Sequence, residues 1–225
     1  MVGSSQFQEN ILTIQTIQIA PFRTLMTALK DILLETNITF TPSGIKIINM
    51  DKSHTILVHL NLASQNFEHF ECKEDKIVIG VNMFHLFKLI NTIDNDDTLT
   101  LYIAEENFSS GIVDKLGLRF ENGDINQTKD QKLKLIEPEE EEMEIPNVDF
   151  SSIITFPSTD FQKIIRDLSS ISERLEIKSV GNELIFKCCG PFAEGEIRRG
   201  ESDSVTEFIK NPDASKIIQG EFSLK

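Results

Sequence analysis

The stretch Glu137-Pro138-Glu139-Glu140-Glu141-Glu142-Met143-Glu144-Ile145-Pro146 divides the chain of 225 residues into two parts. Its glutamates repel one another and its two prolines disfavour regular structure, so it suits neither a helix nor a strand. We therefore expect an extended, acidic surface connector over residues 137–149. Domains are expected over 11–136 and 150–225, preceded by a disordered polar extension over 1–10.

Upstream of the connector, the apolar pattern predicts both helices and strands. Residues 11–19 alternate as in a strand, and Pro21 fits the first position of a helix that runs to about Glu35. A second helix is expected from about Asn82 to Thr92. Further strands are expected at 38–41, 45–49, 54–62, 98–104 and 116–120. This composition predicts an α+β domain built on an antiparallel sheet.

Downstream of the connector, a similar pattern begins again. Residues 150–156 are expected to form a strand, and Ser158 is expected to cap a helix that continues through Leu168. Strands at 175–180 and 184–188 flank the turn pair Gly181-Asn182. In both halves a helix is followed by a hairpin, which indicates a weak internal duplication. The sequence thus predicts two similar α+β domains.

The net charge of −14 is the strongest constraint on function. An acidic surface repels phosphate, so nucleic-acid binding requires the few basic residues to gather in one place. Five basic residues meet this condition, because each lies on the polar face of a predicted helix. These residues are Arg23, Lys30, Lys88, Lys163 and Arg166.

Other compositional features exclude several classes of protein. No apolar run approaches the ~20 residues that a membrane span needs. Cys72, Cys188 and Cys189 are odd in number and match neither a disulfide framework nor a CxxC metal site, which favours a reducing compartment. Asp51, Ser53 and His54 are too close in sequence to form a catalytic triad. The acidic turn at 94–97 lacks the glycine and glutamate of a calcium-binding loop. We expect no catalytic residue, no metal site and no cofactor.

Several motifs together indicate a family. They are Leu29-Lys30-Asp31-Ile32-Leu33, Ser43-Gly44-Ile45, Met50-Asp51-Lys52-Ser53-His54-Thr55-Ile56-Leu57-Val58, Ile79-Gly80-Val81-Asn82, Glu144-Ile145-Pro146 and Ile165-Arg166-Asp167-Leu168-Ser169. In this order they resemble the DNA sliding clamps of the proliferating cell nuclear antigen family, from about Ile11 to the last residue. The resemblance implies a DNA-clamp fold with sheets outside and helices on the inner face of a three-subunit ring.

The resemblance also implies how the basic residues act. The helix faces would line the hole and hold double-stranded DNA without sequence preference, while the acidic rim repels other nucleic acid. Lys129 and Lys134 match basic family positions more loosely and join this DNA-binding set. Edge strands near 127–136 and 194–199 would pair between the subunits of a homotrimer.

A second surface is implied for partner proteins. By resemblance, a groove under the connector would take short peptides of DNA polymerase, flap endonuclease and DNA ligase, and an ATP-driven clamp loader would open the ring. The groove residues would be Met50, His54, Leu57, Met143, Ile145 and Pro146. The alternative for Met143 and Ile145 is that they only pin the connector to the sheet. The expected location is the nucleus, or the site of viral DNA replication.

The resemblance predicts more chain than is present. After the strand at 221–225 the family continues with another helix and more sheet, so the second domain is expected to be incomplete. The family's ubiquitin-modified lysine falls at Gly181, with Lys178 nearby. Two alternatives to a complete clamp stay open. One is a truncated, clamp-like protein that sequesters clamp partners without encircling DNA, and the other is a fragment of a longer clamp.

Overall fold

The computed structural model describes residues 9–109, 111–139, 143, 145, 147, 149–202, 206–210 and 216–224. Two compact units divide the chain, residues 1–146 and 147–225, and each is described by itself. The division falls inside the stretch 137–149 that we expected to be a connector. The proposed extension over residues 1–10 lies outside the described residues except for Glu9 and Asn10, and Asn10 already belongs to the first strand.

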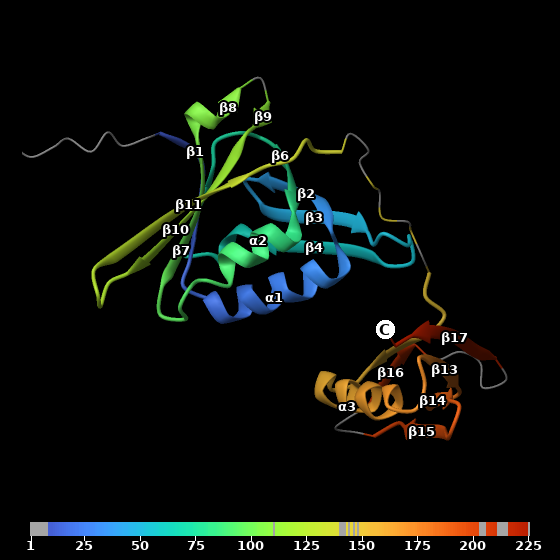
Figure 1. Ribbon diagram of the computed structural model, residues 1–225. Helices are drawn as coiled ribbons and strands as arrows, with labels where there is room; N and C mark the ends of the chain where they lie inside the picture. Colours follow the sequence, from blue (N-terminus) through green and yellow to red (C-terminus); the bar gives the residue numbers. More distant parts are fainter. Residues whose placement is uncertain are drawn as a thin grey trace, which may run out of the picture. The chain divides into compact units, whose positions relative to one another are not determined.

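The described part of the first unit is built from two large antiparallel sheets, the small two-stranded sheet β8-β9, and two helices that lie side by side (Figure 1). One large sheet has the strand order β11-β10-β7-β1-β5 and the other has the order β4-β3-β2-β6. The elements are β1 (Asn10–Thr16), α1 (Ile19–Ile32), β2 (Glu35–Thr41), β3 (Gly44–Met50), β4 (Leu57–Ala63), η1 (Ser64–Asn66), β5 (His69–Cys72), β6 (Ile77–Asn82), α2 (Met83–Ile90), β7 (Thr98–Ala104), η2 (Glu105–Asn107), β8 (Phe108–Ser109), β9 (Ile112–Val113), β10 (Lys115–Asn122) and β11 (Gln127–Lys134).

The second unit repeats the first half of this plan. Its order β15-β14-β13-β17 corresponds to β4-β3-β2-β6, and its pair β12-β16 corresponds to β1-β5. The elements are β12 (Ile153–Thr155), α3 (Ser158–Ser169), β13 (Arg174–Val180), β14 (Glu183–Cys189), β15 (Glu194–Gly200), β16 (Glu207–Lys210) and β17 (Ile217–Ser223). The α+β class and the duplication predicted from the sequence are both present in this topology.

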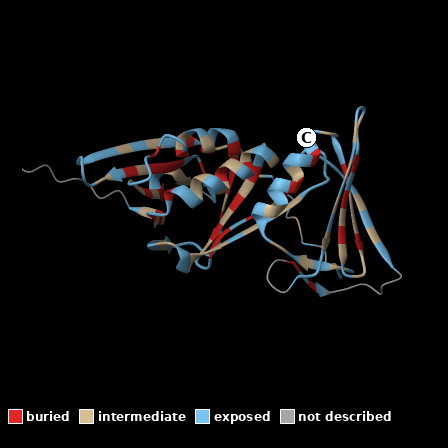
Figure 2. Cartoon of the chain, turned by 90° about the horizontal axis from the view of Figure 1, so that it is seen from below, coloured by how far each residue is buried: buried red, intermediate tan, exposed pale blue. Residues whose placement is uncertain are grey.

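The core of the first unit lies between the sheets and the helices. Leu12, Leu99, Leu118 and Ile90 are each fully buried there. Figure 2 colours such buried positions red along the strands and helices. Burying one such side chain stabilises the fold by about 1.5–3 kcal/mol. The second unit has a smaller core around Phe186.

No helix in the described part of the chain is long and apolar enough to cross a membrane.

The ends of the first predicted helix and strand were wrong. The strand stops at Thr16, because the Thr16 Oγ1 accepts a hydrogen bond from Gln18 N at 3.0 Å and the chain turns. Ile19 then begins α1, two residues before Pro21. Proline is tolerated at this third position because N–H groups in the first turn have no helical acceptor. The helix ends at Ile32, since Glu35 already begins β2.

Three other predicted elements were shorter than expected. The strand at 54–62 begins only at Leu57, and the helix expected from Asn82 starts at Met83 and stops at Ile90. Asn82 caps this helix instead, accepting a hydrogen bond from His85 N at 3.1 Å. The strand at 150–156 is reduced to β12. Ser158 is the first residue of α3 and makes no side-chain cap.

Candidate functional site

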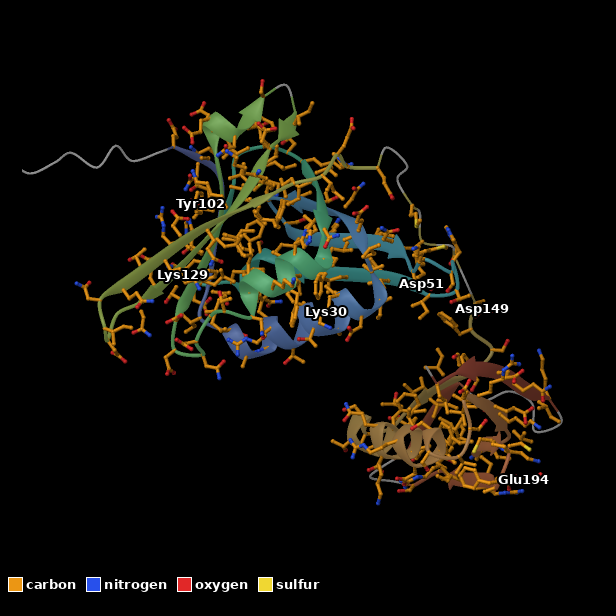
Figure 3. All side chains as sticks on the ribbon, in the orientation of Figure 1. Lys30, Asp51, Tyr102, Lys129, Asp149 and Glu194 are labelled. Carbon is orange, nitrogen blue, oxygen red and sulfur yellow. The ribbon has the colours of Figure 1, made fainter. Side chains whose placement is uncertain are left out.

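Two of the predicted DNA-binding lysines, Lys30 on α1 and Lys88 on α2, lie over phenyl rings of α2. Lys30 Nζ lies 4.9 Å from the centroid of the Phe87 ring and also pairs with the Asp31 carboxylate. Lys88 Nζ lies 4.4 Å from the centroid of the Phe84 ring, and its side chain is exposed. The lysine stems cover apolar surface while their charges stay near solvent. The side-by-side helices therefore each carry a cation that lies over a ring of α2, and Figure 3 labels the one on α1, Lys30.

Arg23 has a structural role that the sequence did not indicate. Its guanidinium donates to Asn95 Oδ1 at 3.0 Å and to the Ile93 carbonyl oxygen, which ties α1 to the segment after α2. Its Nε is buried and has no hydrogen-bond partner among the described residues. Because these groups hold the guanidinium, Arg23 is less free to follow a moving phosphate than the two lysines are.

Lys129 and Lys134, two of the three lysines of β11, lie on opposite faces of the sheet. Lys129 shares the face of buried Leu133, and its Nζ donates to Thr92 Oγ1, just after α2, at 2.8 Å. Lys134 has the other parity and pairs across the sheet with Lys115. The structure therefore brings Lys129 toward the helices but not Lys134. Side chains alternate between the two faces of a strand, and Lys129 and Lys134 are an odd number of positions apart. Their location on opposite faces could therefore have been predicted from the sequence.

In the second unit, Lys163 and Arg166 are exposed on α3. Ile164 and Leu168 are buried beneath them, as the predicted amphipathic pattern requires. Arg166 lies in the last turn, where a positive charge stabilises the helix dipole. Both cations are therefore on the solvent side of their helix, available to a polyanion.

A cleft lies on the outer face of the β4-β3-β2-β6 sheet, where the partner groove is predicted. Met50 on β3 pairs with Leu57 on β4, and the start of the connector lies over the neighbouring strands. The cleft, of about 510 Å³, separates connector from sheet, and Met143 contributes to its roof. The cleft is lined by Asn37, Thr39, Thr41, Lys46, Ile48, Lys76, Val78, Pro138, Glu139 and Met143. The structure thus brings Met143 to the same sheet face as Met50 and Leu57.

The connector is attached to this sheet at two points. Ile136 N donates to Gly80 O at 3.0 Å, as in a strand pair. A Cβ on Gly80 would lie 2.6 Å from the Ile136 carbonyl oxygen, so only glycine permits this approach. Continuing the pairing would place Pro138 opposite Val78, but proline has no N–H to donate. The chain therefore leaves the sheet edge there, and Glu139 is held by the side chain of Asn37 instead.

The remaining groove residues have separate positions. His54 lies in the loop between β3 and β4 with a left-handed backbone (φ 56°). Ile145 is 48% exposed, and Pro146 lies outside the described residues. Neither His54 nor Ile145 is among the described residues that line the cleft. Their assignment to the groove stays a prediction.

The Asp51 carboxylate organises the His54 loop (Figure 3). It accepts hydrogen bonds from the Ser53 hydroxyl, from Ile56 N at 2.6 Å and from Thr55 N at 2.7 Å. These bonds, led by that of Ser53, hold the pKa of Asp51 well below its ordinary value. Asp51 and Ser53 are therefore in contact, but their contact stabilises a turn. The Asp51 carboxylate accepts hydrogen bonds from the loop backbone and from the Ser53 hydroxyl. This loop explains why the strand predicted from His54 begins only at Leu57.

The acidic turn at 94–97 is also structural. Asp94 N donates to Asp97 Oδ2 at 3.1 Å, and Asn122 Nδ2 donates to Asp97 Oδ1 at 2.8 Å. The Asp97 carboxylate is therefore occupied by protein donors. Within the described ranges, no three His, Cys, Asp or Glu side chains form a group that could hold a metal ion.

A polar cluster on the outer face of the five-stranded sheet was not anticipated. Tyr102 Oη donates to Asp130 at 2.8 Å, and Arg119 Nη2 pairs with the same carboxylate at 3.3 Å. The Tyr102 ring lies over Gly117, where a Cβ would approach the ring to 2.2 Å. Burial and the Asp130 carboxylate together raise the pKa of Tyr102 to about 12. The four residues rigidify the strands that lead to the edge strand β11.

Comparison with known proteins identifies both units. The model for the N-terminal domain of proliferating cell nuclear antigen matches residues 11–142, and the model for its C-terminal domain matches residues 144–220. A probable DNA polymerase sliding clamp 1 of Paramecium bursaria Chlorella virus 1 is 32% identical over 223 residues, covering 96% of this chain and 81% of the viral protein. The proliferating cell nuclear antigen of Chaetomium thermophilum is 30% identical over 180 residues, covering 80% of this chain and 67% of that protein.

A solved structure agrees with these relatives. The crystal structure of the proliferating cell nuclear antigen from Entamoeba histolytica has a TM-score of 0.82 and 26% sequence identity. It covers 96% of this chain, and this chain covers 82% of it. The agreement extends over both units, as the two family models do.

Proposed function

This chain belongs to the proliferating cell nuclear antigen family of DNA sliding clamps, and on that premise we propose that three copies close into a ring around duplex DNA. A sliding clamp is a DNA polymerase processivity factor: it holds the polymerase on its template and is a scaffold, so we assign this chain no reaction of its own. The observation that carries the proposal is the set of exposed basic side chains on α2 and α3, namely Lys88, Lys163 and Arg166, with the half-buried Lys30 beside them on α1. Two similar clamp domains in one chain supply such helices in each copy.

The residues of the DNA-facing surface that we propose differ in how freely their charges can move. Lys30, Lys88, Lys163 and Arg166 present their charges from helices, and Lys129 adds a charge beside α2. Arg23 contributes charge from a fixed position, and Lys134 is left out because it lies on the opposite face of its strand. Cations on flexible stems hold phosphates without reading bases, which suits a protein that slides.

Ring closure would use two edge strands. β11 is at the edge of its sheet in the first unit, and β15 is at the edge of its sheet in the second. Every second residue over 130–134 and 194–198 is charged on the outward face of its strand, and one antiparallel register opposes only unlike charges on that face, although it places Lys129 opposite Arg199 on the other face. The pairs are Lys134 with Glu194, Lys132 with Glu196 and Asp130 with Arg198.

The cleft under the connector would receive partner proteins. Apolar Met50 and Leu57 lie on the sheet face beside it, and Met143 lies in its roof. A short helix or extended peptide with an apolar anchor suits such a surface. We assign to it interaction peptides of DNA polymerase, flap endonuclease and DNA ligase, with an ATP-driven clamp loader opening the ring. The corresponding location is the nucleus, or the site of viral DNA replication.

Clamp-dependent DNA synthesis tests this proposal. The triple variant Lys30→Gln, Lys88→Gln, Arg166→Gln removes three charges but keeps most of each side-chain stem. The control Lys52→Gln, Lys115→Gln, Lys187→Gln removes three charges from positions away from the proposed DNA-facing helices. We expect the first variant alone to shorten the products of primer extension, and the loss to grow as salt is raised. Equal products from both variants would contradict the DNA-facing assignment.

A further inference from the structure

Phe84 is an exposed aromatic side chain in an unusual position. It is the second residue of α2, and 44% of it is exposed, although Met83 and Leu86 beside it are fully buried in the core. The adjacent His85 is also exposed. Its ring centroid lies 6.4 Å from that of Phe84, and the two ring planes are tilted by 45°. The phenyl ring therefore contributes little to the core and presents apolar surface to solvent.

One cation lies over this ring, and a second lies over a neighbouring ring of the same helix. Lys88, one helical turn further along α2, places its Nζ 4.4 Å from the Phe84 centroid. On the neighbouring turn, Lys30 of α1 places its Nζ 4.9 Å from the centroid of Phe87. Two phenyl rings and two ammonium groups thus form a patch along the side-by-side helices α1 and α2. Such a patch repels an apolar peptide with basic character and attracts an aromatic or anionic ligand.

A nucleotide with an unpaired base fits both features at once. Its phosphate attracts the Lys88 ammonium, and its base has a flat π-face that can stack on a phenyl ring. In intact duplex both faces of a base are already covered by its neighbours, so the ring has nothing to stack on. Base stacking on aromatic side chains is also tolerant of sequence, which agrees with the other contacts of this surface.

We propose that Phe84, with Lys88, is a stacking site for an unpaired DNA base, such as the first base beyond a primer–template junction. The phosphate of that nucleotide withdraws the Lys88 ammonium from the ring, and the base takes its place on the exposed phenyl face. This inference rests on the proposed function, since it requires DNA to pass along α1 and α2. It adds a preference for junctions over uninterrupted duplex.

Photochemical crosslinking tests the stacking directly. The probe is a hairpin duplex with a single-stranded tail whose first unpaired base is 5-iodouracil, and the reference is a blunt duplex with the same base paired. The full chain is irradiated with each probe at low salt, and the crosslinked residue is identified by mass spectrometry. We expect a crosslink at Phe84 with the tailed probe and not with the blunt one.

Two variants separate stacking from nearby binding. Phe84→Leu keeps an apolar side chain but removes the ring, and should lower the crosslink yield about tenfold or more. Phe192→Leu removes a ring that is 75% exposed in the second unit and should leave the yield unchanged. No crosslink at Phe84, or equal yields from the two probes, overturns the proposal. Because clamp-dependent synthesis by the unmodified chain is measured separately, such a result leaves the clamp function standing.

Discussion

The side chain of Asn37 and the backbone of Glu139 hold each other through two reciprocal hydrogen bonds. Asn37 Nδ2 donates to Glu139 O at 2.8 Å, and Glu139 N donates to Asn37 Oδ1 at 3.0 Å. The side-chain amide of Asn37 thereby replaces the backbone hydrogen bonds of a paired strand. It does so next to Pro138, where the pairing with β6 stops. The start of the connector is consequently fixed to the sheet that forms the floor of the cleft.

Asn37→Ala should release the connector from the sheet. Both hydrogen bonds are lost, which should lower the free energy of unfolding by about 1 kcal/mol because the pair is exposed. Hydrogen exchange at the Glu139 amide should accelerate, and Asn61→Ala on the same sheet face is the control. Unchanged exchange at Glu139 would show that these bonds do not hold the connector.

Tyr102 should titrate near pH 12. It is the only tyrosine and the chain has no tryptophan, so phenolate absorbance reports this side chain alone. Burial first, and then the hydrogen bond to Asp130, raise its pKa to about 12, against about 10 in an unfolded chain. Because the folded-state pKa is the higher one, the stabilising contribution of the neutral phenol is complete below about pH 10. It is then lost as the pH rises to about 12.

Asp130→Asn separates the two causes of this shift. Removing the carboxylate charge should bring the midpoint of the titration closer to 10, while burial keeps it above the value of the denatured chain. A midpoint near 10 in the unmodified folded protein would contradict the buried position of the phenol.

Gly117→Ala should destabilise the first unit. A Cβ at this position would lie 2.2 Å from the Tyr102 ring, which would have to move away. Such overpacking lowers the free energy of unfolding by about 1–3 kcal/mol. Gly123→Ala, where a Cβ would meet no atom within 4 Å, is the matched control for chemical denaturation. Equal stabilities for the two variants would mean that the ring does not cover Gly117.

Reversing one charge on β11 should weaken the trimer. Lys132→Glu places two carboxylates opposite each other in the proposed pairing with β15, and Glu196→Lys in the same chain should restore opposite signs. Light scattering on dilution should show earlier dissociation of the single variant and recovery in the double variant. Lys115→Glu, on the neighbouring strand β10, should have no effect. Dissociation that the second change fails to rescue would refute this register.

The sequence predicted elements better than their ends, for a local reason. Apolar alternation identifies β7 to the residue, from Thr98 to Ala104, because burial decides where it lies. Helix and strand ends instead depend on single polar side chains. Thr16 turns the chain toward α1, Asn82 caps α2 and Asp51 holds back the start of β4. Threonine, asparagine and aspartate occur in turns, at helix caps and inside regular elements. The residue type alone therefore does not predict where an element ends.

The site was predictable where it depends on periodicity. Lys88, Lys163 and Arg166 are on the solvent side of their helices, as the amphipathic pattern indicates. The structural role of Arg23 was not predictable, since its acceptors at Ile93 and Asn95 are about seventy positions away. The attachment of the connector was hidden for the same reason, because Asn37 and Glu139 meet across a separation of 102 positions.

Encirclement of DNA is the central claim, and retention on circular DNA measures it most directly. The protein is loaded onto a nicked, primed circle with a clamp loader and ATP, free protein is removed, and half of the sample is cut with a restriction enzyme. A closed ring should stay on the intact circle and slide off the linear ends. Equal release from circle and linear DNA, or equal retention on both, would contradict the account.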